Sequence, residues 1–249
     1  MATIKNEVAN NANEIASSAN KTASVYVSVG EVANENKTIV GFGALKPYQN
    51  KDGQEKSPSA KDVFYKISQI DNFLKAIEAN KIGIDIKGTD KDGNAAYMQA
   101  NVFYKTGVGE NGKAFGFNKL AITVTPEIKT PAGEIQQQEQ KLYATKGKAG
   151  YSFDSNCDNA VIAKFNEAVK GGAEFTLRAK KNETLHEYPK LMEIVDKVKG
   201  GSANIELAFV KEQGAVIKSI SVNDKNGNAI GETKLENRVA AKKSKDKER

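Results

Sequence analysis

Short segments in which apolar residues occupy every second position constrain the fold of this chain more than any other feature. Val25, Val27 and Val29 follow this pattern, which is typical of a half-buried strand. Asp-Gly and Asn-Gly dipeptides at residues 92–93 and 111–112 favour tight hairpins. The sequence therefore predicts a β-rich chain. The predicted strands are residues 22–32, 37–46, 62–66, 82–87, 96–106, 114–125, 141–146, 174–180, 203–210 and 215–222.

Apolar residues at helical spacing predict three helices, over residues 68–80, 160–170 and 189–198. Asp158 or Asn159 is available as an N-cap for the second helix, and Pro189 stands in the first turn of the third. Gly-Gly pairs follow the second and third helices, and a predicted strand follows each pair. This repetition of helix, Gly-Gly and strand indicates a duplicated substructure.

These elements predict a β-rich α+β protein. The order strand, strand, strand, helix, strand, strand over residues 22–106 is similar to the connectivity of the OB-fold, a five-stranded Greek-key barrel. We expect an OB-like antiparallel barrel or sheet core with about three helices and a smaller C-terminal helix–strand region. The expected organisation is a flexible N-terminal arm (1–22), an OB-like domain (23–146), an α+β region packed on it (147–233) and a basic mobile tail (234–249).

Lysine dominates the charge of the chain. The formal net charge is +6, from 37 basic and 31 acidic residues. Seven basic and three acidic residues lie in the segment from Lys234 to Arg249. This tail either binds a polyanion loosely or is simply a solvated terminus. Only Arg178, Arg238 and Arg249 are arginines. Arginine is the side chain that most often hydrogen-bonds to guanine in the major groove, so this composition disfavours sequence-specific recognition of duplex DNA.

Sequence features favour a cytoplasmic protein, and this cytoplasm could be that of a host cell. No apolar run approaches the roughly 18 residues of a membrane helix, and the first thirty residues lack a secretory apolar stretch. The single cysteine, Cys157, cannot form an internal disulfide. We therefore expect no membrane partner.

Motifs of enzymes and metal sites occur only in unfavourable contexts. The glycine-rich residues 107–114 match a phosphate-binding pattern, but a strand follows them where a helix is required, which predicts a hairpin tip. Residues 90–94 and 224–228 resemble the start of calcium-binding loops, but the sixth position, where such loops need glycine, is Ala95 or Ala229. We predict that both segments are turns. Cys157 and His186 are a possible nucleophile and base. A lone thiol and a lone imidazole are more often incidental, so we expect no enzyme, cofactor or metal.

The positions of aromatic residues carry the functional hypothesis. If Leu120, Ile122 and Val124 face the core, strand alternation places aromatic and lysine side chains on the opposite face. The alternative is that another element covers this second face and that its rings are ordinary core. The residues predicted to bind nucleic acid are Tyr26, Phe42, Lys46, Tyr97, Phe103, Lys113, Phe115, Phe117 and Lys119.

An open sheet face with rings and lysines suits single-stranded nucleic acid, because bases stack on rings while ammonium groups follow the phosphates. The first hypothesis is therefore a non-enzymatic single-stranded DNA-binding protein of the sort that phages or plasmids encode, with DNA favoured over RNA. The alternative is a structural or assembly protein, such as a virion component, that forms homo-oligomers through edge-to-edge strand pairing.

Overall fold

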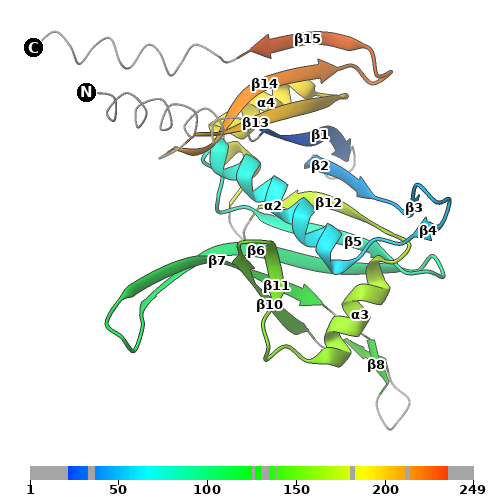
Figure 1. Ribbon diagram of the computed structural model, residues 1–249. Helices are drawn as coiled ribbons and strands as arrows, with labels where there is room; N and C mark the ends of the chain where they lie inside the picture. The colour runs from blue at the N-terminus through cyan, green and yellow to red at the C-terminus, as the bar shows by residue number, and fades with distance from the viewer. Residues whose placement is uncertain are drawn as a thin grey trace, which may run out of the picture. The chain divides into compact units, whose positions relative to one another are not determined.

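The computed structural model describes residues 22–32, 37–124, 127–129, 135–137, 139–179, 183–210 and 213–234 (Figure 1). These residues form a β-rich α+β fold with three α-helices and one short 3₁₀ helix, η1. The predicted N-terminal arm, apart from Thr22, and nearly all of the predicted basic tail lie outside the described residues. The elements are β1 (Thr22–Val32), β2 (Lys37–Leu45), β3 (Tyr48–Gln49), β4 (Glu55–Lys56), α2 (Ala60–Ala76), β5 (Gly83–Thr89), β6 (Ala95–Val108), β7 (Ala114–Val124), β8 (Glu127–Lys129), β9 (Ile135–Gln137), β10 (Gln140–Gly147), β11 (Gly150–Phe153), α3 (Asn159–Val169), β12 (Gly172–Arg178), η1 (Leu185–Glu187), α4 (Pro189–Val198), β13 (Ser202–Val210), β14 (Gly214–Asn223) and β15 (Ala229–Lys234).

The chain divides into two compact units, each assembled from separated segments. Of the described residues, the first unit contains those within 22–38, 72–80 and 188–234, and the second contains those within 39–71 and 81–187. Segments far apart in the sequence meet within the second unit, because β12 pairs with both β2 and β5.

The second unit is built on an antiparallel sheet with the strand order β11-β10-β7-β6-β5-β12-β2. The prediction of a β-rich α+β protein with an antiparallel barrel or sheet core is confirmed, and the core is an open sheet that does not close into a barrel. Its order also differs from that of an OB-fold, because β12 from the C-terminal half lies between β5 and β2. The strands without a counterpart among the predicted strands are β3, β4, β8, β9, β11 and β15.

One face of this sheet forms the core of the second unit. Its buried side chains include Ile84, Ile86, Met98, Leu120 and Ile122. Helix α3 crosses the same face, since a Cβ added to Gly88 would lie 2.3 Å from the carbonyl oxygen of Ala168. An aromatic cluster completes this core: Phe64 of α2 lies 4.9 Å from Phe153 and 6.4 Å from Phe165 between ring centroids.

Helix α2 begins eight residues before the predicted helix and includes residues 62–66, which were predicted as a strand. That prediction is wrong because a capping box starts the helix there. The backbone N–H and the hydroxyl of Ser59 donate to the Asp62 carboxylate at 2.9 and 2.6 Å, and the backbone N–H of Asp62 donates to the Ser59 carbonyl. Val63, Ile67 and Ile70 then form one buried stripe.

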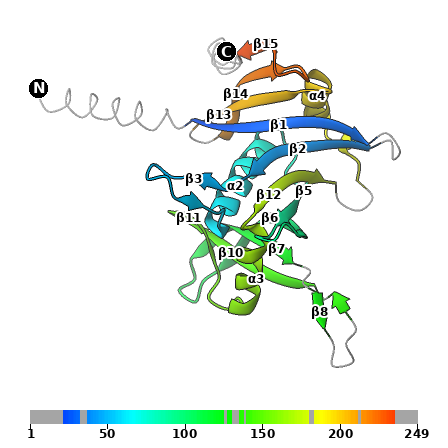
Figure 2. The ribbon, with the colours of Figure 1, turned by 90° about the vertical axis from the view of Figure 1, so that its right-hand side faces the viewer.

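The first unit contains the antiparallel sheet β1-β13-β14-β15, with α4 beside its strands (Figure 2). Val25, Val27 and Val29 of β1 are buried, as the alternation predicts. Leu191, Ile194, Val195 and Val198 form the buried stripe of α4.

The two units share one local arrangement, which supports the predicted duplication. Each has a helix, a Gly-Gly pair and a strand that pairs with the first strand of a hairpin: α3 and β12 with β5, and α4 and β13 with β14. Cβ atoms added to Gly171 and Gly201 would lie 2.3 and 2.2 Å from the carbonyl oxygens of Asp90 and Asn223. The close approach excludes a side chain at either position.

The loops at residues 90–94 and 224–228 are turns, as predicted. In each loop, the first aspartate accepts the N–H groups of residues two and four positions later, at 2.8–2.9 Å. The glycine-rich tip between β6 and β7 is also the predicted hairpin, with Gly112 at a φ of 72° and the Gly109 N–H bonded to the Lys113 carbonyl.

Candidate functional site

Strand register places the predicted aromatic residues on the sheet face opposite the core of the second unit. Val102 pairs with buried Leu120, and Phe103 pairs with Lys119. Because neighbouring side chains alternate between faces, Phe103 and Lys119 lie on the opposite face. We call it the open face. Its side chains on β6 and β7 are Tyr97, Gln99, Asn101, Phe103, Lys105, Phe115, Phe117, Lys119, Ala121 and Thr123.

The rings on the open face reach solvent. Tyr97 is 70% exposed, Phe103 42% and Phe115 40%. Phe117 is half-buried, because its ring lies nearly parallel to that of Phe115 at a centroid distance of 5.7 Å. The alternative interpretation, in which these rings are ordinary core, does not apply to Tyr97, Phe103 and Phe115.

Beyond the body of the sheet, β6 and β7 pair only with each other. Residues 104–118, here called the arm, form a two-stranded ribbon, since pairing with β5 ends at Ala100 and pairing with β10 ends at Lys119 (Figure 1). Aromatic side chains cover two of the glycines of this ribbon. A Cβ added to Gly107 would lie 2.6 Å from the Phe115 ring, and one added to Gly116 would lie 2.1 Å from the Tyr104 hydroxyl.

At the base of the arm, Lys119 is held by an acidic residue from the segment before α3. Its Nζ lies 2.6 Å from the Asp154 carboxylate and 5.5 Å from the centroid of the Tyr143 ring. The Thr145 hydroxyl donates to the same carboxylate at 2.6 Å. Lys119, Tyr143 and Asp154 line a hollow of about 540 Å³, which we call the Lys119 hollow. Its other lining residues are Phe103, Tyr104, Lys105, Thr106 and Asn156.

The pKa of Asp154 lies below its ordinary value. Desolvation raises it, but the hydrogen bonds from Lys119 and Thr145 and the charges of Lys119 and Lys105 outweigh that effect. The pKa values of Asp90 and Asp224 are also lowered, chiefly by hydrogen bonds from Asn94 and Asn228. All three carboxylates are therefore ionised at neutral pH.

These three shifts predict that acid weakens the fold. A carboxylate with a lowered folded-state pKa adds stability above its unfolded value, near pH 4, and this stability is lost as the pH falls through the folded-state pKa. We expect the melting temperature to fall from about pH 4 downward in thermal denaturation, with a smaller fall in the Asp154→Asn variant. A melting temperature that is constant between neutral and strongly acidic pH contradicts this expectation.

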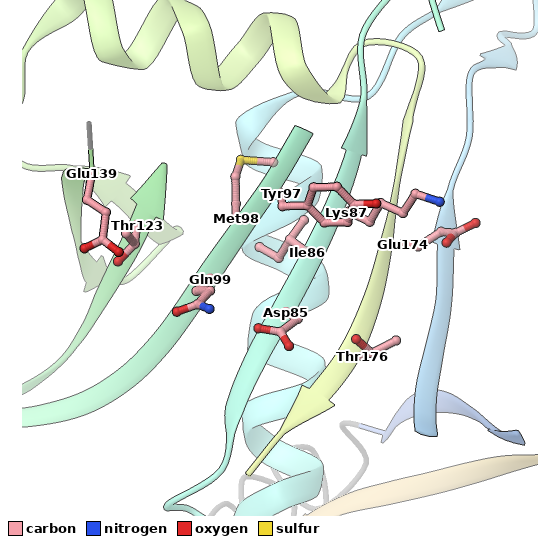
Figure 3. Close-up of a pocket in the computed structure, with 10 residues that line it drawn as sticks. All are labelled: Asp85, Ile86, Lys87, Tyr97, Met98, Gln99, Thr123, Glu139, Glu174 and Thr176. Carbon is pink, nitrogen blue, oxygen red and sulfur yellow. The ribbon is translucent and has the colours of Figure 1, made fainter. Parts of the chain in front are cut away.

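A second hollow, of about 390 Å³, lies where β5, β6 and β12 adjoin on the open face (Figure 3). We call it the Asp85 hollow. Its titratable lining includes the acidic residues Asp85, Glu139 and Glu174 against one lysine, Lys87. Arg178 beside it donates to Asp85 at 2.7 Å. Unlike the Lys119 hollow, this end of the face carries excess negative charge. The remaining lining residues are Ile86, Tyr97, Met98, Gln99, Thr123 and Thr176.

The structure brings together five of the nine predicted site residues on the open face: Tyr97, Phe103, Phe115, Phe117 and Lys119. The exposed Lys113 lies at the hairpin tip. The other predicted residues lie elsewhere. They are Tyr26 on β1 of the first unit, Phe42 on β2, and Lys46, which follows β2.

Phe42 corrects the prediction for the first hairpin. Its side chain is fully buried, because Val40 and Phe42 form the apolar phase of β2 and this phase faces the core. The strand is also three places from β6 in the sheet order, separated from it by β12 and β5. Phe42 therefore cannot stack with a ligand on the open face.

Lys105, Tyr143 and Asp154 were missed from the sequence. Lys105 lies two residues after Phe103 on β6, so strand alternation alone was enough to place it on the open face. Tyr143 lies on the same face because it pairs with Ala121 of β7. Asp154 gave no such signal. Its position depends on β11 and on the backbone N–H that it donates to the Tyr143 carbonyl.

Cys157 has a structural role at the edge of β10. Its sulfur accepts the Tyr143 N–H at 3.3 Å, and its thiol donates to the Tyr143 carbonyl at 3.2 Å. These contacts continue the hydrogen bonding of β10 beyond its pairing with β11. His186, the other member of the pair considered from the sequence, lies in η1.

Within the described ranges, no group of three or more His, Cys, Asp and Glu residues is arranged to hold a metal ion. Over the same ranges, no helix combines the length and apolar character needed to cross a bilayer. Neither family models nor curated proteins show a match to this chain.

Proposed function

We propose that this chain is a non-enzymatic protein that binds single-stranded DNA on the open face of its second unit. The observation that carries the proposal is the exposure of Phe103 and Phe115 on the same sheet face as Lys105 and Lys119. Stacking of a base on an exposed ring contributes about 1–3 kcal/mol and tolerates any sequence. Exposed rings are otherwise costly in water, which favours a ligand that covers them.

The distribution of charge indicates where the strand runs. Lys105 and Lys119 lie among the rings at the base of the arm, and Lys113 lies at its tip. The Asp85 hollow at the other end of the face disfavours phosphates, because its three carboxylates outnumber Lys87 and the adjacent Arg178. We therefore place the strand along the arm and across the Lys119 hollow.

Single strands suit this surface better than a duplex does. Ring stacking requires bases that are not already stacked on a pair of neighbours, and a lysine-based surface contacts phosphates without reading base edges. Binding of this kind thus requires neither bidentate arginine contacts to bases nor a helix that enters the major groove.

Titration of labelled oligothymidine with the full chain tests this function. We expect tighter binding of the single strand than of a duplex of equal length, and we expect affinity to fall as salt is raised from about 50 to 200 mM. Absence of binding at low salt, or equal affinity for the duplex, would falsify the proposal.

One observation favours the second candidate function, assembly. Tyr104 and Val108 lie on the other face of the arm and are 65% and 69% exposed, so this ribbon presents apolar groups on both faces. Its unpaired edges are also able to pair with another copy of the chain. Light scattering after size-exclusion chromatography, without DNA, distinguishes the two functions: a large closed ring or polymer favours assembly.

A further inference from the structure

The Asp154 carboxylate is the meeting point of several hydrogen-bond donors and positive charges on the open face. The Lys119 ammonium and the Thr145 hydroxyl both approach it at 2.6 Å. The charge of Lys105 also acts on it. The side chains of Lys119 and Asp154 are only 18% and 16% exposed, so solvent and salt screen this ion pair less than they screen a fully exposed pair.

The same donors suit a phosphate oxygen. Ammonium and hydroxyl groups are common phosphate ligands in proteins, and a carboxylate accepts the hydrogen bonds that a phosphate would accept. Two rings adjoin this point, since Lys119 pairs with Phe103 on β6 and lies over Tyr143 of β10.

We propose that the Lys119 hollow is a nucleotide subsite in which the Asp154 carboxylate occupies the position of a backbone phosphate and competes with it. This inference rests on the proposed function. In the unbound protein Asp154 satisfies Lys119 and Thr145, and a bound strand has to take these donors from it. Asp154 therefore holds the affinity of the open face below the value that its lysines and rings allow.

The Asp154→Asn variant tests this competition. The amide keeps an oxygen that accepts the Thr145 hydrogen bond but removes the negative charge, which frees Lys119 for a phosphate. We expect oligothymidine to bind about three to ten times more tightly at low salt, and the plot of log affinity against log salt to steepen by about 0.7, the value for one more phosphate contact on a single strand.

Two further variants separate local competition from a general change in charge. Asp52→Asn makes the same charge change in the exposed loop between β3 and β4, and we expect it to alter affinity by less than about twofold. Lys119→Gln removes the proposed phosphate ligand, so Asp154→Asn should give little or no gain in the Lys119→Gln background. Circular dichroism confirms that each variant is folded.

The outcomes are distinguishable. Tighter binding by Asp154→Asn that disappears in the Lys119→Gln background supports the subsite. An equal gain from Asp52→Asn, an equal gain without Lys119, or no gain at all overturns the subsite, and the proposed function then stands on the binding of the unmodified chain. If the unmodified chain does not bind oligothymidine, both proposals are wrong.

Discussion

Replacing Phe115 and Phe117 together with alanine is expected to weaken the binding of single-stranded oligothymidine by roughly 100-fold. Each ring that stacks with a base contributes about 1–3 kcal/mol, and two losses near the lower end of this range give that factor. The two rings lie nearly parallel at 5.7 Å on one face of the arm. Fluorescence anisotropy of a labelled strand measures the change.

Two controls make this result specific. Tyr65 of α2 and Tyr48 of β3 are 66% and 57% exposed but lie off the open face, and their alanine variants should bind within about twofold of the unmodified chain. Because Phe115 also covers Gly107, a Phe115→Leu and Phe117→Leu variant keeps apolar cover on the arm. It should lose most of the binding too, and full retention of affinity by this variant contradicts the stacking account.

The second large effect concerns stability. Gly171→Ala is expected to lower the free energy of unfolding by about 2–3 kcal/mol, because the added Cβ would lie 2.3 Å from the Asp90 carbonyl oxygen and 2.9 Å from that of Thr89. Both contacts are with backbone, which has to move. The shift also disturbs the 2.7 Å hydrogen bond from the Gly171 N–H to Thr89. Urea denaturation measures the loss.

The duplicated substructure predicts a matching effect in the first unit. Gly201→Ala should be similarly destabilising, since its Cβ would lie 2.2 Å from the Asn223 carbonyl oxygen. Gly30→Ala is the matched control, because nothing lies within 4 Å of its added Cβ, and we expect a change of less than about 1 kcal/mol. Equal stability of all three variants would refute the close-approach explanation of the two Gly-Gly pairs.

The alternation of side chains along β6 and β7 predicted the open face, because the side on which a strand residue lies depends only on local backbone geometry. Once Leu120 and Ile122 were assigned to the core, strand pleating fixed the side of Phe115, Phe117 and Lys119. The same reasoning succeeded for the turns at residues 90–94 and 224–228, where an aspartate bonds to nearby backbone N–H groups.

Features that depend on distant segments were not predictable. The insertion of β12 between β5 and β2 joins residues about 90 and 130 positions apart, and no local pattern specifies it. The pairing of Lys119 with Asp154 likewise requires β10 and β11 to be placed first. At residues 62–66 the apolar pattern fits a strand as well as a helix, and the Ser59–Asp62 capping box decided between them.

Photo-cross-linking of an oligothymidine strand with iodouracil substitutions, followed by mass spectrometry, tests the central claim most directly, because this base reacts with the rings on which it stacks. Our account predicts cross-links to Phe103, Phe115 or Phe117 on β6 and β7, and their suppression by unlabelled single strand. Cross-links confined to other elements, such as β1 or α4, would contradict it.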